Sequence, residues 1–280
     1  MKIVFFTRQG YESNQLFRYM HARVASRYPD CEIVAVYPRT KQQSLSQRIQ
    51  KSWKKMRQLG WFDSLEILSS YPLQLHFAEQ HRRERDALMR CLPRPTDEIC
   101  GNSARVVGTV NGPDAVQTIR SLNPDVVIQA GAGILRSQIF QIGRLGCLNL
   151  HHGIAPLIRG MNSIYWGLWE NRPEWIGSTV HQIDEGIDTG KVLAYAPVQQ
   201  LQPDEGFPSL FVRATELGVD RLLDVLSRLE AGERWTTPPL AGESAYRSTV
   251  SGWKLMLLAW RLRARRNVCA REPRGEASQP

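Results

Sequence analysis

Apolar positions recur along the chain with two different periods. Residues 2–6 (KIVFF) form a short apolar run, and residues 32–37 (EIVAVY) are apolar and rich in β-branched side chains. Between them, residues 13–27 carry apolar side chains at the three- and four-residue spacing that predicts a helix with one buried face. The chain therefore begins as strand, helix and strand, which is the start of a parallel α/β sheet.

The same rhythm returns after residue 104. Strands are predicted at 104–110 (ARVVGTV), 125–130 (DVVIQA) and 147–152 (CLNLHH), with a helix at 113–122 (PDAVQTIRSL), a further helix at 162–171, and two paired strands at 177–184 (GSTVHQID) and 191–198 (KVLAYAPV). Alternating strands and helices predict a Rossmann-like sheet with helices on its faces.

Two segments do not fit this rhythm. Residues 39–98 are polar, basic and helical in pattern, with tryptophans and prolines, and we interpret them as a helical insertion into the sheet domain. Residues 205–231 have helix spacing, and 251–267 form a last helix that starts apolar and ends basic. We therefore expect a catalytic domain over 1–204 and a helical extension over 205–280, whose final dozen residues are disordered.

The formal charge of +9 is concentrated in two places. Residues 39–61 contain seven Lys or Arg and no acid, and residues 251–280 contain seven basic and two acidic residues. The rest of the chain has a formal charge of −3, since these segments hold 14 of the 36 basic and only 2 of the 27 acidic residues. The body of the protein is not basic, which argues against a nucleic-acid-binding fold. Each of the two segments is either a solvated helix face or a patch that binds a polyanion or an anionic membrane.

Several classes of protein are disfavoured by composition. With 42% hydrophobic and 22% charged residues the chain is typical of globular proteins. Its five cysteines include no C-x-x-C pair, so we expect no zinc or redox site and a reducing, cytoplasmic location. The N-terminal apolar run is short for a signal peptide, and no stretch approaches the ~20 apolar residues of a membrane span.

The densest group of chemically useful side chains lies between Asn149 and Asp188. Asn149 and His151 are two residues apart at the end of a predicted buried strand, so both point to the same side. Open α/β sheets build their sites at such carboxyl ends. Asp188 lies in the turn GIDTG, whose glycines 186 and 190 would let the backbone bring the carboxylate close. Alone, each element is also typical of a capped strand end or an ordinary turn.

Together these three residue types suit acyl or formyl transfer to an amine. The Asn149 amide can donate to an oxygen that becomes negative, and His151 can donate to that oxygen or relay a proton. Asp188 can orient the imidazole and stabilise its charged form. No nucleophilic Ser or Cys is needed if the amine attacks the donor directly.

The run LNLHHGIAPLIRG, followed by GSTVHQIDEGIDTGKVL, resembles the folate-dependent formyltransferases that act on glycinamide ribonucleotide, methionyl-tRNA or nucleotide-linked sugars. The shared features are Asn149-x-His151, a P-x-x-x-G loop from Pro156 to Gly160, and the segment from Val180 to Gly190. The resemblance covers residues 104–200 well and 1–37 loosely. It implies a catalytic trio of Asn149, His151 and Asp188.

The resemblance also implies a donor site. Members of this family bind 10-formyltetrahydrofolate, and need no metal, through the loop before the Asn-x-His strand. Here that loop is AGAGILR, which would line the pterin slot with Gly133, Ile134 and Leu135, and Ile183 and Ile187 would close the other side. His181 matches a histidine that flanks the same site. His152 departs from the small residue usual after the trio's histidine, and it either faces solvent or meets an acidic acceptor group.

The acceptor amine is the least constrained part of the assignment. The tRNA-acting branch carries a C-terminal barrel, whereas residues 205–280 look helical, so nucleic acid is disfavoured as a partner. The purine-pathway branch has a glycine-rich phosphate loop that QGYESN only faintly matches. A small nucleotide-linked amino sugar is therefore the expected acceptor. A non-catalytic binding module, and an enzyme held at a membrane surface by its basic C-terminal helix, remain alternatives, and the oligomeric state is open.

Overall fold

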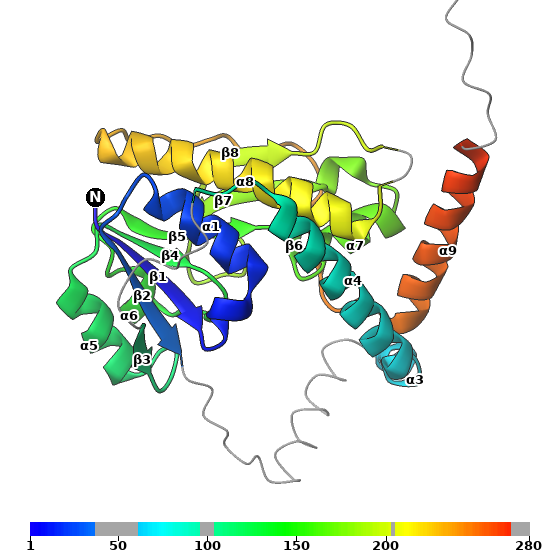
Figure 1. Ribbon diagram of the computed structural model, residues 1–280, viewed down its shortest axis with the longest axis horizontal. Helices are drawn as coiled ribbons and strands as arrows, with labels where there is room; N and C mark the ends of the chain where they lie inside the picture. Colours follow the sequence, from blue (N-terminus) through cyan, green and yellow to red (C-terminus); the bar gives the residue numbers. More distant parts are fainter. Residues whose placement is uncertain (37–60, 96–103, 203–204, 270–280) are drawn as a thin grey trace, which may run out of the picture.

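A mostly parallel seven-stranded sheet forms the centre of the protein (Figure 1). The computed structural model describes residues 1–36, 61–95, 104–202 and 205–269. The strands are β1 (Ile3–Arg8), β2 (Cys31–Val36), β3 (Arg105–Val107), β4 (Val126–Gln129), β5 (Gly146–His151), β7 (Gly177–Gln182) and β8 (Val192–Pro197). Their order is β3-β2-β1-β4-β5-β7-β8, with the first five parallel and β7 antiparallel to both of its neighbours. The predicted α/β class and the paired strands near residue 180 are confirmed.

Helices cover both faces of this sheet. They are α1 (Gln15–Ala25), α3 (Trp61–Ser69), α4 (Tyr71–Cys91), α5 (Pro113–Leu122), α6 (Ser137–Phe140), α7 (Ser163–Trp169), α8 (Phe207–Glu230) and α9 (Gly252–Cys269), with short 3₁₀ turns at Tyr11–Ser13 and Pro173–Trp175. Alternate residues of β1 separate the two faces: Ile3 and Phe5 point toward α1 and α8, whereas Val4 and Phe6 point toward α5 and α6.

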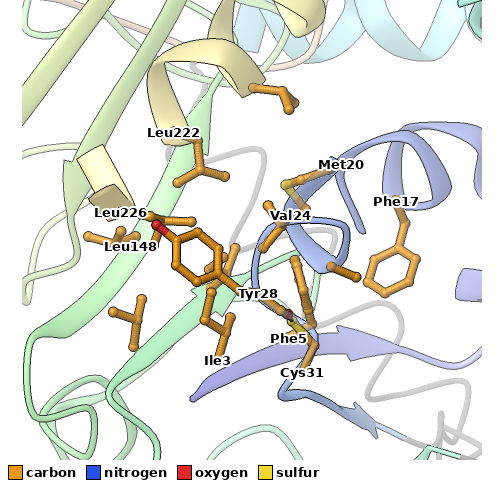
Figure 2. Packing of buried hydrophobic residues seen from close by; sticks show 14 of the residues in the cluster. Ile3, Phe5, Phe17, Met20, Val24, Tyr28, Cys31, Leu148, Leu222 and Leu226 are labelled. Atoms are coloured by element: carbon orange, nitrogen blue, oxygen red, sulfur yellow. Dashed lines mark hydrogen bonds between the residues drawn. The ribbon is translucent and has the colours of Figure 1, made fainter. Parts of the chain in front are cut away.

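Helix α8 shares the main hydrophobic core with the sheet. Figure 2 shows Leu222 and Leu226 of α8 in one cluster with Ile3 of β1, Leu148 of β5 and Val24 of α1. All five side chains are fully or almost fully buried. A boundary at residue 204 would therefore cut through one continuous core rather than separate two.

The described part of the 39–98 insertion is helical, as predicted. Helix α4 packs along α8 and α9 and reaches α1 (Figure 1). Met89 of α4 is fully buried and belongs to the main core cluster. The basic run at 39–60 and the final residues 270–280 lie outside the described residues.

The extension after residue 205 is not helical throughout, contrary to our expectation. Strand β9 (Ala245–Arg247) pairs in parallel with β6 (Ile158–Gly160), which was also not predicted. Each strand is only three residues long, too short to show alternation in the sequence. Their pairing places residues 245–247 beside the loop that follows β5. Within the described ranges, no helix has the length and apolar character needed to cross a membrane.

Candidate active site

The end of β5 places an amide and an imidazole on one face of the sheet. Asn149 and His151 lie on this strand with Leu150 between them, and Leu150 packs against the main core on the opposite face. The antiparallel register with β7 sets His181 directly beside Asn149 and Thr179 beside His151. Cross-strand neighbours are close enough for their side chains to interact, so the sheet itself brings these residues together.

A tightly turned loop between β7 and β8 supplies the carboxylate. The Oδ1 atom of Asp184 accepts hydrogen bonds from the Gly186 amide at 3.0 Å and from the Thr189 hydroxyl at 2.7 Å. Asp188 itself adopts the left-handed region, with φ of 50°. Glycine is required at 190 by crowding instead, since a Cβ there would lie 1.8 Å from the Gln182 carbonyl oxygen. The expected freedom of the turn glycines is thus not what bends the loop.

Asp188 is the centre of a four-residue polar cluster. Its Oδ2 atom lies 3.4 Å from Nδ1 of His151, and its Oδ1 atom lies 3.5 Å from Nε2 of His181. The Nδ2 atom of Asn149 lies 3.4 Å from Asp188 Oδ1 and 3.2 Å from His181 Nε2. The structure therefore brings the three predicted catalytic residues together and adds His181 to them.

The tautomer of His181 follows from its second ring nitrogen. Nδ1 lies 2.8 Å from the Gln182 carbonyl oxygen, so it carries a hydrogen and donates. In the neutral ring Nε2 is then an acceptor, and Asn149 donates to it. Both hydrogens of the Asn149 amide are thus directed at His181 and Asp188. One of them must turn toward a reacting oxygen before Asn149 can stabilise negative charge there.

His151 has an acceptor beside each ring nitrogen. Nδ1 faces the Asp188 carboxylate, and Nε2 lies 3.2 Å from the Ile158 carbonyl oxygen and 3.4 Å from the Ser163 hydroxyl. Burial lowers the pKa of His151 below its ordinary value, because the Asp188 carboxylate opposes this effect only in part. The ring is neutral at rest, yet a proton that it gains would be held from both sides.

Asp188 stays ionised in this half-enclosed place. Burial alone would raise the pKa of its carboxyl group. The His181 ring 3.5 Å from Oδ1, the charge interaction with His151 and the 2.9 Å hydrogen bond from the Gly160 amide together lower that pKa to about 2. A fixed negative charge therefore faces two imidazoles.

A cavity of about 210 Å³ opens on one side of the cluster. All five residues predicted for the donor site line it: Gly133, Ile134, Leu135, Ile183 and Ile187. Asn149, His181 and Asp188 form its inner wall. The apolar walls and the polar floor would suit a flat ring system with a polar edge. We refer to this space as the donor cavity.

Gln129 also lines the donor cavity and was missed from the sequence. Its Nε2 atom donates to the Gly133 carbonyl oxygen at 3.0 Å, and its Oε1 atom accepts from the Gly131 amide at 3.1 Å. The side chain thereby holds the loop that forms the cavity wall. Its position at the end of β4, opposite Asn149 in the register, was the available signal.

A second cavity of about 340 Å³ opens on the other side of the cluster. It is bounded by His151, Ser163 and Asp188 at its polar end and by Phe207 and Phe211 of α8 at its apolar end. We refer to it as the acceptor cavity. The two phenylalanines were not predicted as site residues, because in the sequence they read only as the buried face of a helix.

His152 borders the acceptor cavity and does not face solvent as one of our expectations had it. Its ring stacks on Phe211 with centroids 4.2 Å apart, and its Nε2 atom lies 2.8 Å from the Thr215 hydroxyl. Burial, with His151 and Arg85 nearby, lowers the pKa of His152 to about 3. The ring is therefore uncharged and cannot meet a phosphate as a cation.

The largest of the described cavities lies away from this chemistry. It has a volume of about 650 Å³ and surrounds Gly146, at the beginning of β5, with Arg144 and Trp235 on its walls. None of the four cluster residues lines it. The volume of the cavities alone would therefore have placed the site at the wrong end of β5. Among the residues that the structure describes, no group of three or more His, Cys, Asp or Glu side chains is placed to hold a metal ion.

Known proteins resemble the part of the chain that carries the cluster. The family model described as formyl transferase matches residues 94–226. A methionyl-tRNA formyltransferase from Geobacter metallireducens is 37% identical over 124 residues, which is 44% of this chain and 39% of that protein. The chain spans less than half the length of the curated relatives it matches.

Solved structures share the fold at low sequence identity. A sugar N-formyltransferase from Shewanella sp. FDAARGOS_354 matches with a TM-score of 0.50 at 16% identity, over 89% of this chain and 77% of that one. HypX from Aquifex aeolicus, solved in complex with tetrahydrofolic acid, matches with a TM-score of 0.51 at 16% identity, over 90% of this chain and 30% of that one. The sheet, the cluster around Asp188 and the match over 94–226 agree: the segment that carries the site is similar to the formyl transferase family.

Proposed function

We propose that the protein transfers a formyl group from 10-formyltetrahydrofolate to a primary amine. The observation that carries this proposal is the position of Asn149, His151, His181 and Asp188 between two cavities. A donor in one cavity and an amine in the other would meet at this cluster. The match of residues 94–226 to the formyl transferase family model supports the same chemistry.

The donor cavity fits a reduced pterin. The backbone of Gly133 to Leu135 lines it, and Ile134 and Ile187 expose apolar surface, 73% and 43% respectively, that a flat ring would cover. Bound there, 10-formyltetrahydrofolate supplies the electrophilic formyl carbon. Reaction would join that carbon to the amine nitrogen and release the folate nitrogen, with one proton moving from the amine to the folate.

The cluster residues would assist this exchange in different ways. One hydrogen of the Asn149 amide would turn toward the formyl oxygen as it becomes negative. Neutral His151 would take up or relay the proton, helped by the acceptors beside each of its nitrogens. The charge of Asp188 would stabilise the imidazolium form and fix the ring orientation.

For the acceptor we propose a small nucleotide-linked amino sugar. The acceptor cavity is short and lined by Phe207, Phe211 and Ile164, a surface suited to one ring-sized group. Between residue 205 and residue 269 the described chain consists of α8, β9 and α9, with a single three-residue strand. That stretch contains no barrel of the kind that the tRNA-acting branch carries.

Methionyl-tRNA is the second candidate acceptor. The curated relatives with 37%, 31% and 33% identity are all named methionyl-tRNA formyltransferases, although the match covers less than half of each. The basic run at 39–61 is the feature of this chain that would favour RNA. Glycinamide ribonucleotide has weaker support, from the fold class alone.

The decisive experiment is an acceptor screen with purified protein and 10-formyltetrahydrofolate. Nucleotide amino sugars, charged initiator tRNA and glycinamide ribonucleotide are each incubated with the enzyme, and formylated product is detected by mass. We expect a mass gain of one formyl group on an amino sugar, lost in the Asp188→Asn variant. Product on tRNA alone would replace the sugar as acceptor, and product on none of a broad amine set would overturn formyl transfer.

A further inference from the structure

An apolar surface lies at one end of the molecule, where α3 and α9 meet. Its members are large hydrophobic side chains that are 42% to 87% exposed: Phe62, Leu65, Leu68, Trp253, Leu257 and Trp260. We call this set the α3–α9 surface. Figure 1 shows both helices at the edge of the protein farthest from α5 and β3. Apolar side chains gathered at this exposure are typical of a surface that binds something.

Helix α9 is apolar on both of its sides. Leu255 and Leu258 are 5% exposed and pack in one cluster with Tyr165 of α7. Trp253, Leu257 and Trp260 point away from that cluster, at the three- and four-residue spacing of a single helix face. Docking onto the body explains the inner face. It leaves the apolar side chains of the outer face largely uncovered by the described residues.

Polar contacts fix α3 beside the beginning of α9. Lys254 pairs with Glu66 of α3 at 2.6 Å, and the Ser251 hydroxyl donates to the same carboxylate. The indole nitrogen of Trp253 lies 3.3 Å from the Ser69 hydroxyl. The ion pair neutralises one charge on each helix. The outer faces of the two helices therefore form one surface rather than two separate rows.

Positive charge follows directly on this surface along the chain. Arg261 and Arg263 of α9 lie one turn beyond Trp260 or less, and neither has an acidic partner within the described ranges. In the sequence, four arginines and no acid occur over 261–266, and the seven basic residues of 39–61 end just before Phe62. In the sequence, positive charge thus precedes the apolar residues of α3 and follows those of α9.

We propose that the α3–α9 surface binds an anionic lipid bilayer, with α9 lying in the plane of the membrane. Tryptophans favour the membrane interface, where the ring is apolar and the N–H is wet, and arginines reach the acidic headgroups. Trp and Leu on one helix face, with Lys or Arg on the polar sides next to it, are the pattern of interfacial binding. The outer side chains of α9 are only partly exposed because the helix is packed on the body of the protein, which suits shallow insertion into the bilayer.

Charge argues against a second copy of this chain as the occupant. A two-fold contact through the outer face of α9 would bring Arg261 and Arg263 of one copy toward the same residues of the other, and α9 itself contains no acidic residue to offset them. An anionic surface removes that repulsion and gains attraction from each arginine. The same residues therefore favour lipid and disfavour self-association.

Sedimentation with vesicles tests this proposal on the full-length protein. At low salt, we expect binding to phosphatidylcholine vesicles that contain phosphatidylglycerol and little binding to phosphatidylcholine alone. Replacing both Arg261 and Arg263 by Gln removes about fivefold in partition coefficient per residue. The matched control, Arg120→Gln with Arg234→Gln, removes two exposed arginines elsewhere and leaves binding near the wild-type level.

The apolar part is tested by Leu257→Ser with Trp260→Ser. We expect a loss of at least tenfold in partition, whereas Leu217→Ser with Leu240→Ser, at two exposed leucines off this surface, changes it less than twofold. Circular dichroism confirms that each variant is folded. No binding of the wild type to anionic vesicles overturns the proposal. So does a wild-type dimer in sedimentation equilibrium that the Leu257/Trp260 variant dissociates, since that result identifies a second copy as the occupant.

Discussion

The amide nitrogen of Gly160 donates a hydrogen bond to the Oδ2 atom of Asp188 over 2.9 Å. This bond joins the end of β6 to the loop between β7 and β8, and the two residues are 28 apart in the sequence. Gly160 has φ of 97°, and a Cβ there would lie 2.2 Å from the Arg247 carbonyl oxygen, so no other residue fits well. The carboxylate is thereby held between one amide and two imidazoles.

Removing the charge of Asp188 should stop catalysis without unfolding the protein. Asp188→Asn keeps the shape of the side chain but cannot stabilise the imidazolium of His151, so we expect turnover to fall by about 100-fold or more. His151→Ala and Asn149→Ala should lower it on the same scale, through proton transfer and oxyanion stabilisation respectively. Steady-state rates of formylation measure all three.

Asp184→Asn is the matched control for Asp188→Asn. Asp184 is exposed in the same loop, and an Asn side-chain oxygen can still accept from the Gly186 amide and the Thr189 hydroxyl. We expect this variant to keep at least half of wild-type turnover. Near-native rates in all of the variants at Asn149, His151 and Asp188 would show that the cluster is not the reacting centre.

The donor cavity predicts a binding defect that is separable from chemistry. Ile187→Ser removes apolar surface that a pterin would cover, so KM for the folate donor should rise about tenfold, equivalent to about 1.4 kcal/mol, while kcat changes little. Leu240→Ser is the control, because Leu240 is also 43% exposed but lies outside that cavity. Equal effects of the two substitutions on KM would remove Ile187 from the donor site.

His21 predicts a loss of stability in mild acid. The ring is fully buried against Phe5 and Phe17, and neither nitrogen has a hydrogen-bond partner within the described residues. Burial lowers its pKa to about 4, whereas in the unfolded chain it is about 6.5. Below pH 6.5 the unfolded chain therefore binds a proton at His21, whereas the folded protein keeps this ring neutral. Stability from the neutral ring is lost as the pH falls toward 4, by about 3 kcal/mol at most.

Thermal unfolding of His21→Leu over a range of pH measures this effect. Relative to the wild type, the variant should gain more in Tm at pH 5 than at pH 8. His76→Leu, at an exposed histidine of α4, should not show that difference. His151 and His152 also have lowered pKa values, so part of the acid sensitivity persists in the variant. Parallel pH curves for His21→Leu and the wild type would refute the role of His21.

Metal removal should leave formyl transfer unchanged. The roles that we assign to Asn149, His151 and Asp188 use hydrogen bonds and one fixed charge. Activity should therefore survive dialysis against a chelator, measured with the acceptor found in the screen. A loss that zinc or iron restores would contradict this mechanism and favour metal-assisted chemistry at the same residues.

Regular periodicity explains which parts of the fold could be predicted. The two-residue spacing of Asn149 and His151 on a buried strand was enough to place both side chains on one face. By contrast, β6 and β9 pair across 87 residues through three positions each, and nothing local in either segment marks that contact. Local patterns report on how an element packs but not on which element it meets.

The site could be predicted only where the sequence carries a chemical signal. Asp188 could be predicted as a site residue because it lies in a turn that the sequence marks with glycines. The turn depends, however, on the left-handed backbone of Asp188 itself and not on the conformational freedom of those glycines. Phe211 and His152 gave no such signal, because stacking between the end of β5 and a helix some 60 residues later depends on how α8 lies across the sheet. Roles for the residues of both cavities stay predictions until the variants are measured.

The inner side of α9 has a consequence for any attempt to shorten the protein. Leu255 and Leu258 pack in one cluster with Tyr165, whose ring stacks on Phe207 at 3.6 Å between centroids, and Phe207 is a wall of the acceptor cavity. Only one layer of aromatic side chains thus separates the last helix from the space where the amine would bind. Deleting α9 to improve solubility would leave that layer facing water and free to repack, so a truncated enzyme would be expected to change which amines it accepts.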